Sequence, residues 1–66
     1  MKTFVVGYLS FFDNEIEMEK VQAENELEAV KNSKFLAEND LTGYDSVDEI
    51  DYMLSGCDAT ISVIEV

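Results

Sequence analysis

Residues 4–12 read Phe-Val-Val-Gly-Tyr-Leu-Ser-Phe-Phe, and all of them except Gly7 and Ser10 are apolar. β-Branched and aromatic side chains favour a strand, and in this one the apolar residues fall on both alternating faces. Such a strand is either covered on both sides or lies in the middle of a sheet with one face available to a partner. We expect residues 4–12 to be the central strand of a sheet.

A second strand should follow in a hairpin. Asp13-Asn14 is a turn-forming pair, and residues 15–23 begin with strict alternation of glutamate and apolar side chains. The alternation changes phase at Lys20, after which the apolar residues fall on the glutamate side. A β-bulge or strong twist near Lys20 would bring the two halves into one strand.

The first helix is expected over about residues 25–38. Asn25 followed by Glu28 forms a capping pair, because the Asn oxygen can accept a hydrogen bond from a free amide of the first turn. Helical spacing places Phe35 outside the buried side of this helix, so it either packs under a neighbouring segment or belongs to an interface. The expected buried stripe consists of Ala29, Val30, Ser33, Leu36 and Ala37, with Leu27 at its edge.

Helix and strand signals continue to the end of the chain. Ser46 and Glu49 form a capping box that opens a second helix, and Gly56 is suited to end it. The buried stripe of this helix is Val47, Ile50 and Leu54. Residues 59–66 alternate as a final strand.

These elements predict an α+β fold, a small single domain spanning residues 1–66 with the order β-β-α-α-β. The helices should pack on one face of a three-stranded sheet, and the apolar run 4–12 suggests the strand order 2-1-3. Counting each helix as one reversal, we expect the last strand to run parallel to the first. Two sheet edges remain, and such edges invite pairing with another chain.

Composition excludes several classes of protein. Fifteen acids face four lysines, for a net charge of −11, and the chain has no histidine and one cysteine. It therefore lacks the residues for a disulfide scaffold or a structural zinc site, and its charge opposes direct binding to nucleic acid. No apolar run approaches the roughly 20 residues that cross a bilayer, and no cleavable leader is recognisable. We expect a cytoplasmic protein without a cofactor and without membrane contact.

The sequence contains few residues suited to catalysis. No histidine can act as a general base near neutral pH, and no glycine-rich phosphate loop is present. Cys57 follows a predicted helix end beside Asp58, where both electric fields disfavour the thiolate, so we expect a buried or half-buried structural thiol. Paired carboxylates of the glycosidase type are disfavoured because so short a chain leaves no room for a substrate cleft. We expect no enzyme and no catalytic residue.

A cation site is one alternative. Residues 38–49 resemble an EF-hand calcium loop in part, with acids at positions 1, 3 and 12 and glycine at position 6. Glu38 replaces the usual aspartate at position 1, and Asp45 occupies a position that is normally aliphatic. The Ser46 capping box accounts for the same residues without a metal, so we expect an acidic connection and no metal site.

The acidic surface is the strongest signal. Alternate glutamates of the second strand should form a row of charges about 6–7 Å apart. The mutual repulsion of so many carboxylates destabilises the folded chain, but their field speeds the encounter with basic partners. The competing explanation is that the charge serves solubility alone. We therefore predict binding to a basic, nucleic-acid-binding protein, with self-association through sheet edges, Phe11 and Phe35 as the alternative. The partner-binding candidates are Glu15, Glu17, Glu19, Glu24, Asp48 and Asp51.

In size, charge and element order the whole chain resembles the small inhibitors that phages encode against host defence. Anti-CRISPR proteins and DNA-mimic anti-restriction proteins are the nearest examples. No motif carries this resemblance, so it transfers no functional residue. It implies a protein of the host cytoplasm that occupies a positively charged nucleic-acid channel and blocks target binding.

Overall fold

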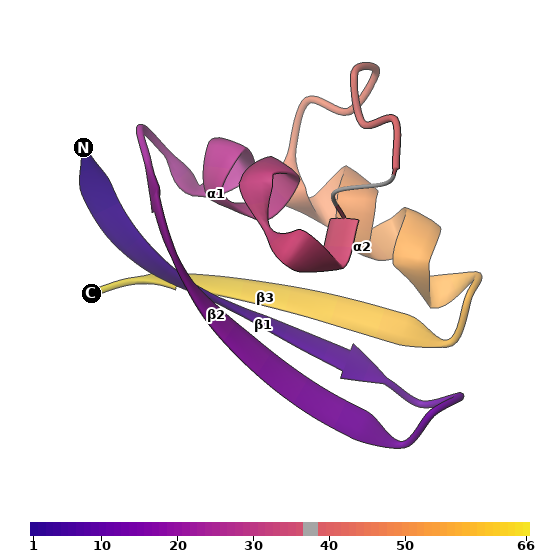
Figure 1. Ribbon diagram of the computed structural model, residues 1–66. Coiled ribbons are helices and arrows are strands. Elements are labelled where there is room, and N and C mark those ends of the chain that lie inside the picture. Colours follow the sequence, from indigo (N-terminus) through magenta and orange to yellow (C-terminus); the bar gives the residue numbers. More distant parts are fainter. Residues whose placement is uncertain (37–38) are drawn as a thin grey trace.

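The computed structural model describes residues 1–36 and 39–66, and it shows an α+β fold with helices on one face of a sheet (Figure 1). β1 lies between β2 and β3, so the predicted element order and the strand order 2-1-3 are confirmed. The elements are β1 (Lys2–Ser10), β2 (Glu15–Ala23), α1 (Glu26–Asn32), the 3-10 helix η1 (Lys34–Leu36), α2 (Val47–Ser55) and β3 (Ala59–Glu65).

The direction of the last strand corrects our expectation, because β3 pairs antiparallel to β1, as β2 does. The cause lies in the connection between the helices. Residues 25–27 at the start of α1 and residues 46–48 at the start of α2 line the same hollow. Both helices therefore begin at the same end of the sheet, and residues 39–46 make an additional return that a count of helices leaves out.

The predicted bulge near Lys20 is also wrong, because β1 and β2 pair without interruption along all nine residues. Val21 and Ala23 are buried next to α1, whereas Glu15 and Glu17 on the same face are exposed. In Figure 1 the hairpin end of β2 bends away from the helices. The change of phase in the sequence therefore marks the place where helix cover ends.

The first helix is shorter than predicted. The Val30 carbonyl accepts hydrogen bonds from the amide and the hydroxyl of Ser33, and the Lys34 amide donates to Glu19 Oε1 at 2.9 Å. In a continuous α-helix the Lys34 amide would donate to Val30 instead. The chain therefore leaves α1 at Ser33, whose ψ is 150°, and re-forms as η1. Residues 37 and 38 of the predicted helix lie outside the described residues.

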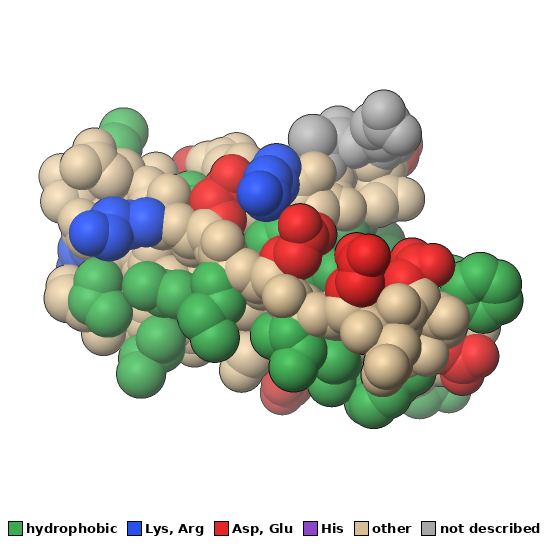
Figure 2. Space-filling model, turned by 60° about the horizontal axis from the view of Figure 1, so that its bottom comes forward, with side chains coloured by type: hydrophobic (Ala, Val, Ile, Leu, Met, Phe, Trp, Pro, Cys, Tyr) green, Lys and Arg blue, Asp and Glu red, His purple; other side chains and the backbone are tan. Residues whose placement is uncertain are grey.

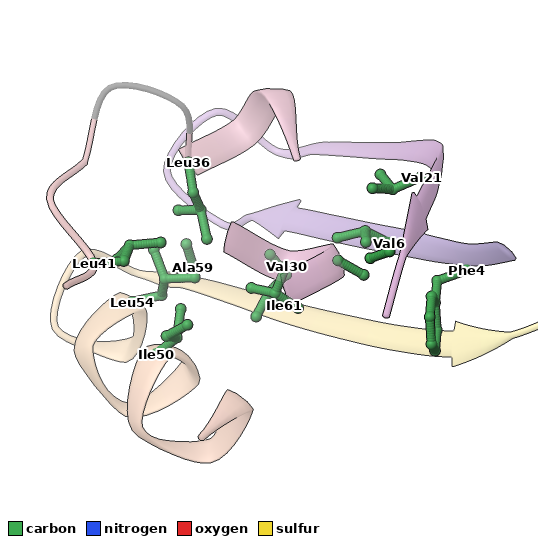
Figure 3. Packing of buried hydrophobic residues seen from close by; sticks show 12 residues of the cluster. Phe4, Val6, Val21, Val30, Leu36, Leu41, Ile50, Leu54, Ala59 and Ile61 are labelled. Carbon is green, nitrogen blue, oxygen red and sulfur yellow. The ribbon is translucent and has the colours of Figure 1, made fainter. Parts of the chain in front are cut away.

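The core lies between the helices and the covered face of the sheet (Figure 3). Phe35 lies beside it, stacked on Tyr8 with ring centroids 5.3 Å apart, so this ring packs within the chain. Each predicted helix stripe is buried at its centre, at Val30 in α1 and at Ile50 in α2. The buried hydrophobic residues are Phe4, Val6, Val21, Ala23, Ala29, Val30, Leu36, Leu41, Ile50, Leu54, Ala59 and Ile61.

The other face of the sheet carries no described helix and is mostly apolar. Ile16, Met18 and Ile64 expose 71%, 70% and 63% of their surface there. Figure 2 shows hydrophobic side chains gathered below a row of acidic ones. We call this surface the open face; alternation along the paired strands assigns to it Thr3, Val5, Gly7, Leu9, Ile16, Met18, Lys20, Gln22, Thr60, Ser62 and Ile64.

Candidate protein-interaction surfaces

The acids are almost all on the surface. Of the fourteen described acidic residues, twelve are exposed, and only Glu19 and Asp51 are half-buried. These two also accept hydrogen bonds from residues nine or more positions away: Glu19 from the Lys34 amide, and Asp51 from Thr60 and Ile61 of β3. Burial and hydrogen bonding therefore separate two structural carboxylates from a larger exposed set.

The first acidic surface is the β2 row, formed by Glu15, Glu17 and Glu19. The register places Glu15 opposite Ser10 and Glu17 opposite Tyr8, so the row follows the hairpin end of an edge strand. Glu15 and Glu17 are exposed and no helix covers them. The Glu19 carboxylate instead accepts a hydrogen bond from the Lys34 amide at the start of η1. The sequence predicted this row correctly but missed the structural use of Glu19.

The second acidic surface, the helix-start cluster, lies at the opposite end of the sheet. Asp48 lines a hollow of about 650 Å³ together with three acids that the sequence analysis did not select: Glu26, Asp45 and Glu65. Glu24 is exposed at the end of β2, directly before the Asn25 cap that also lines this hollow. The signal that could have found these residues is that two helix starts share one end of the sheet.

Asp51 has a structural role. Its Oδ1 accepts hydrogen bonds from Thr60 Oγ1 at 2.6 Å and from the Ile61 amide at 3.0 Å, at the start of β3. The Thr60 hydroxyl, and then the Ile61 amide, hold the pKa of Asp51 below its ordinary value because both stabilise the carboxylate. This residue ties α2 to β3, and the geometry separates it from the exposed acids.

Replacing Asp51 should therefore cost stability in a pH-dependent way. Asp51→Asn keeps an acceptor but loses the charge, so we expect a loss of about 1 kcal/mol at pH 7, roughly 4–8 °C in Tm. A lowered pKa contributes stability above the ordinary value of 3.8 that disappears as the pH falls further. The deficit should shrink between pH 4 and pH 2 in thermal unfolding monitored by circular dichroism. The exposed-site control Glu17→Gln should show no such deficit, and an equal deficit at both pH values would contradict the assignment.

The calcium-loop alternative gains no geometric support. Asp40 Oδ1 accepts from the amide and hydroxyl of Thr42, and these bonds lower the pKa of Asp40. Glu49 accepts from the Asp45 amide and so completes the cap of α2. Glu38 lies outside the described residues. Residues 1–36 and 39–66 contain no group of three acidic, His or Cys side chains placed to hold a metal ion.

Two further sequence expectations can be compared with the structure. Cys57 is exposed, which corrects the expectation of a buried or half-buried thiol; it lies in the turn between Gly56 and Asp58, where no element covers it. In the part of the chain that the structure describes, no helix has the length and apolar character needed to cross a membrane.

A third feature lies on α2 beside the helix-start cluster. Tyr44, Tyr52 and Met53 line an open hollow of about 550 Å³ together with the carboxylates of Asp48 and Glu49. Aromatic faces attract cations, and carboxylates add charge and hydrogen-bond acceptors. The hollow therefore has the chemistry to receive a lysine or arginine side chain.

Comparison with protein-family models, curated proteins and solved structures found no match to this chain. The function must therefore be inferred from the chemistry of these surfaces.

Proposed function

We propose that the chain is a small interaction protein that binds a positively charged surface of a nucleic-acid-binding protein and inhibits it. The observation that carries the proposal is the set of twelve exposed carboxylates among residues 1–36 and 39–66. Such a charge density raises the rate of encounter with a basic partner and disfavours acidic ones. In this mechanism the carboxylates take the positions of phosphates and exclude the nucleic acid.

The spacing of the β2 row fits this mechanism. Neighbouring glutamates on one face of a strand are about 6–7 Å apart, close to twice the 3.4 Å axial step between phosphates of one DNA strand. The helix-start cluster lies roughly 15–20 Å farther along the sheet, judged from the strand rise between Tyr8 and Lys2. Two anionic groups at this separation suit an extended basic groove better than a single basic side chain.

The tyrosine-lined hollow on α2 supplies a complementary contact. A lysine or arginine of the partner would lie against the Tyr52 ring and donate hydrogen bonds to the Asp48 carboxylate. Tyr52 exposes 83% of its surface and so is available without rearrangement. This contact adds aromatic area to an interface that otherwise depends on screened charges.

The class of inhibitor that fits best is the phage-encoded anti-defence protein, of the anti-CRISPR or DNA-mimic kind, acting in the host cytoplasm. Its support is the combination of small size, strong negative charge and a compact β-β-α-α-β fold. The partner would then be a nuclease or surveillance complex whose basic channel holds nucleic acid.

A tagged pull-down from the source cell's lysate tests the proposal. At about 50 mM salt we expect retention of a basic nucleic-acid-binding protein, identified by mass spectrometry. Because exposed ion pairs are screened, retention should fall strongly at about 500 mM salt. Retention of no basic protein at low salt would contradict the proposal, and so would retention that is insensitive to salt.

A further inference from the structure

The open face differs from the rest of the surface in its charge. The chain has fifteen acidic residues, yet none of the eleven residues that form the open face is acidic, and Lys20 is its only charged residue. The glutamates of β2 alternate with its members Ile16 and Met18 and point to the opposite side of the sheet. Charge is therefore segregated from a mostly apolar surface of the kind that marks a protein interface.

The centre of the open face is hollowed at Gly7. Leu9, Ile16, Met18 and Ser62 help to line a depression of about 250 Å³ around it. A Cβ atom built on Gly7 meets no atom within 4 Å, so the missing side chain leaves open space. This depression can receive an apolar side chain from a facing surface.

The charge distribution selects the partner. Two copies of a chain with net charge −11 repel each other in most orientations. When the open faces meet, the β2 glutamates point away from the contact, and apolar side chains meet apolar side chains. A basic partner has no carboxylate to meet on this face, whereas a second copy presents a surface of the same apolar chemistry.

The open face is small for a specific contact between two proteins. A nine-residue strand is about 30 Å long and three strands are about 14 Å wide, which gives a flat footprint of about 400 Å² per copy. Counting the relief of the side chains, two copies would bury about 1,000 Å² in total, at the lower limit for a specific interface. The expected dissociation constant is therefore in the micromolar range.

We infer that the open face is a docking surface for a second copy of this chain, with the two sheets packed face to face about 10 Å apart. The dimer is isologous, so the same apolar side chains of both copies meet around the two Gly7 hollows. It leaves the β2 row and the helix-start cluster of each copy accessible. This inference does not rest on the proposed function.

Sedimentation velocity from about 5 to 500 µM, at 50 and 500 mM NaCl, tests the inference. We expect a concentration-dependent dimer whose dissociation constant falls at high salt, since screening removes the repulsion between the acidic copies. Met18→Lys should raise that constant at least tenfold, although it lowers the net negative charge. The matched control Tyr52→Lys changes the charge equally on the exposed side of α2 and should leave the constant within about twofold.

A second variant distinguishes packing into the hollow from non-specific hydrophobic association. Gly7→Val fills the hollow and adds apolar area in a strand position that a β-branched residue tolerates. A dimer that packs into the hollow should weaken about tenfold, while the circular dichroism spectrum stays unchanged. Three results would overturn the inference: a monomer at every concentration and salt, a dimer insensitive to Met18→Lys, or tighter association of Gly7→Val.

Discussion

Ile50→Ala should destabilise the fold by about 2–5 kcal/mol and lower Tm by roughly 10 °C or more. Ile50 has no exposed surface and lies where α2 packs against the sheet, so removing its outer carbons leaves a cavity in the core (Figure 3). A 66-residue chain has only about 3–10 kcal/mol of stability in total, so this loss removes a large share of it.

The matched control for this variant is Tyr52→Ala, two residues farther along α2. Tyr52 is 83% exposed, and its replacement should change stability by no more than about 0.5 kcal/mol. Urea unfolding of both variants, followed by circular dichroism at 222 nm, gives the comparison. Equal losses in the two variants would mean that α2 is not packed as described.

The second large effect concerns binding. Glu15→Gln/Glu17→Gln should weaken binding to the basic partner about tenfold at low salt, equivalent to 1.4 kcal/mol. Both side chains are exposed at the hairpin end, so the loss should come from charge and leave the fold intact. Glu19 is left unchanged, because its carboxylate holds the Lys34 amide and its replacement would mix folding with binding.

Glu28→Gln/Asp40→Asn provides the charge-matched control for this binding experiment, because both residues are exposed and neither belongs to the β2 row or the helix-start cluster. It removes the same net charge, and an asparagine at position 40 keeps the oxygen that accepts from the Thr42 amide and hydroxyl. Isothermal titration at 50 and 500 mM NaCl should show a difference between the two double variants only at low salt. Equal weakening by both would assign the effect to net charge alone and would contradict a specific role for the β2 row.

Local signals in the sequence determined most of the fold. The Ser46 capping box and Gly56 mark the two ends of α2, and the Asn25 oxygen accepts from the Glu28 amide as the capping pair predicts. The apolar run 4–12 identified β1 as the central strand, although the strand ends at Ser10. These features depend on side chains and amides only a few residues apart.

The errors arose where distant residues decide the structure. The early end of α1 depends on Glu19 of β2 binding the Lys34 amide, a pairing fifteen residues apart. The antiparallel course of β3 depends on the return made by residues 39–46, a stretch with little periodic pattern. No local propensity encodes either feature.

In the candidate surfaces too, local sequence patterns predicted some features and missed those that depend on the tertiary fold. The sequence predicted the β2 row, since alternation alone places its members on one face. It did not predict that Asp48 would join Glu26 and Glu65, which come together only when both helices start at one end of the sheet. From the sequence, the strand at residues 4–12 could be either covered on both faces or open on one. The structure places both helices on one side of the sheet and leaves the other face open.

The central claim is that the exposed carboxylates compete with nucleic acid for one basic surface. The most direct measurement is the affinity of the purified partner for a fluorescent DNA or RNA duplex at increasing concentrations of this chain. Competition predicts that the apparent dissociation constant of the duplex rises linearly with the chain concentration, with the amplitude at saturation unchanged. A ternary complex, or an apparent constant that does not change while the chain is bound, would contradict the account.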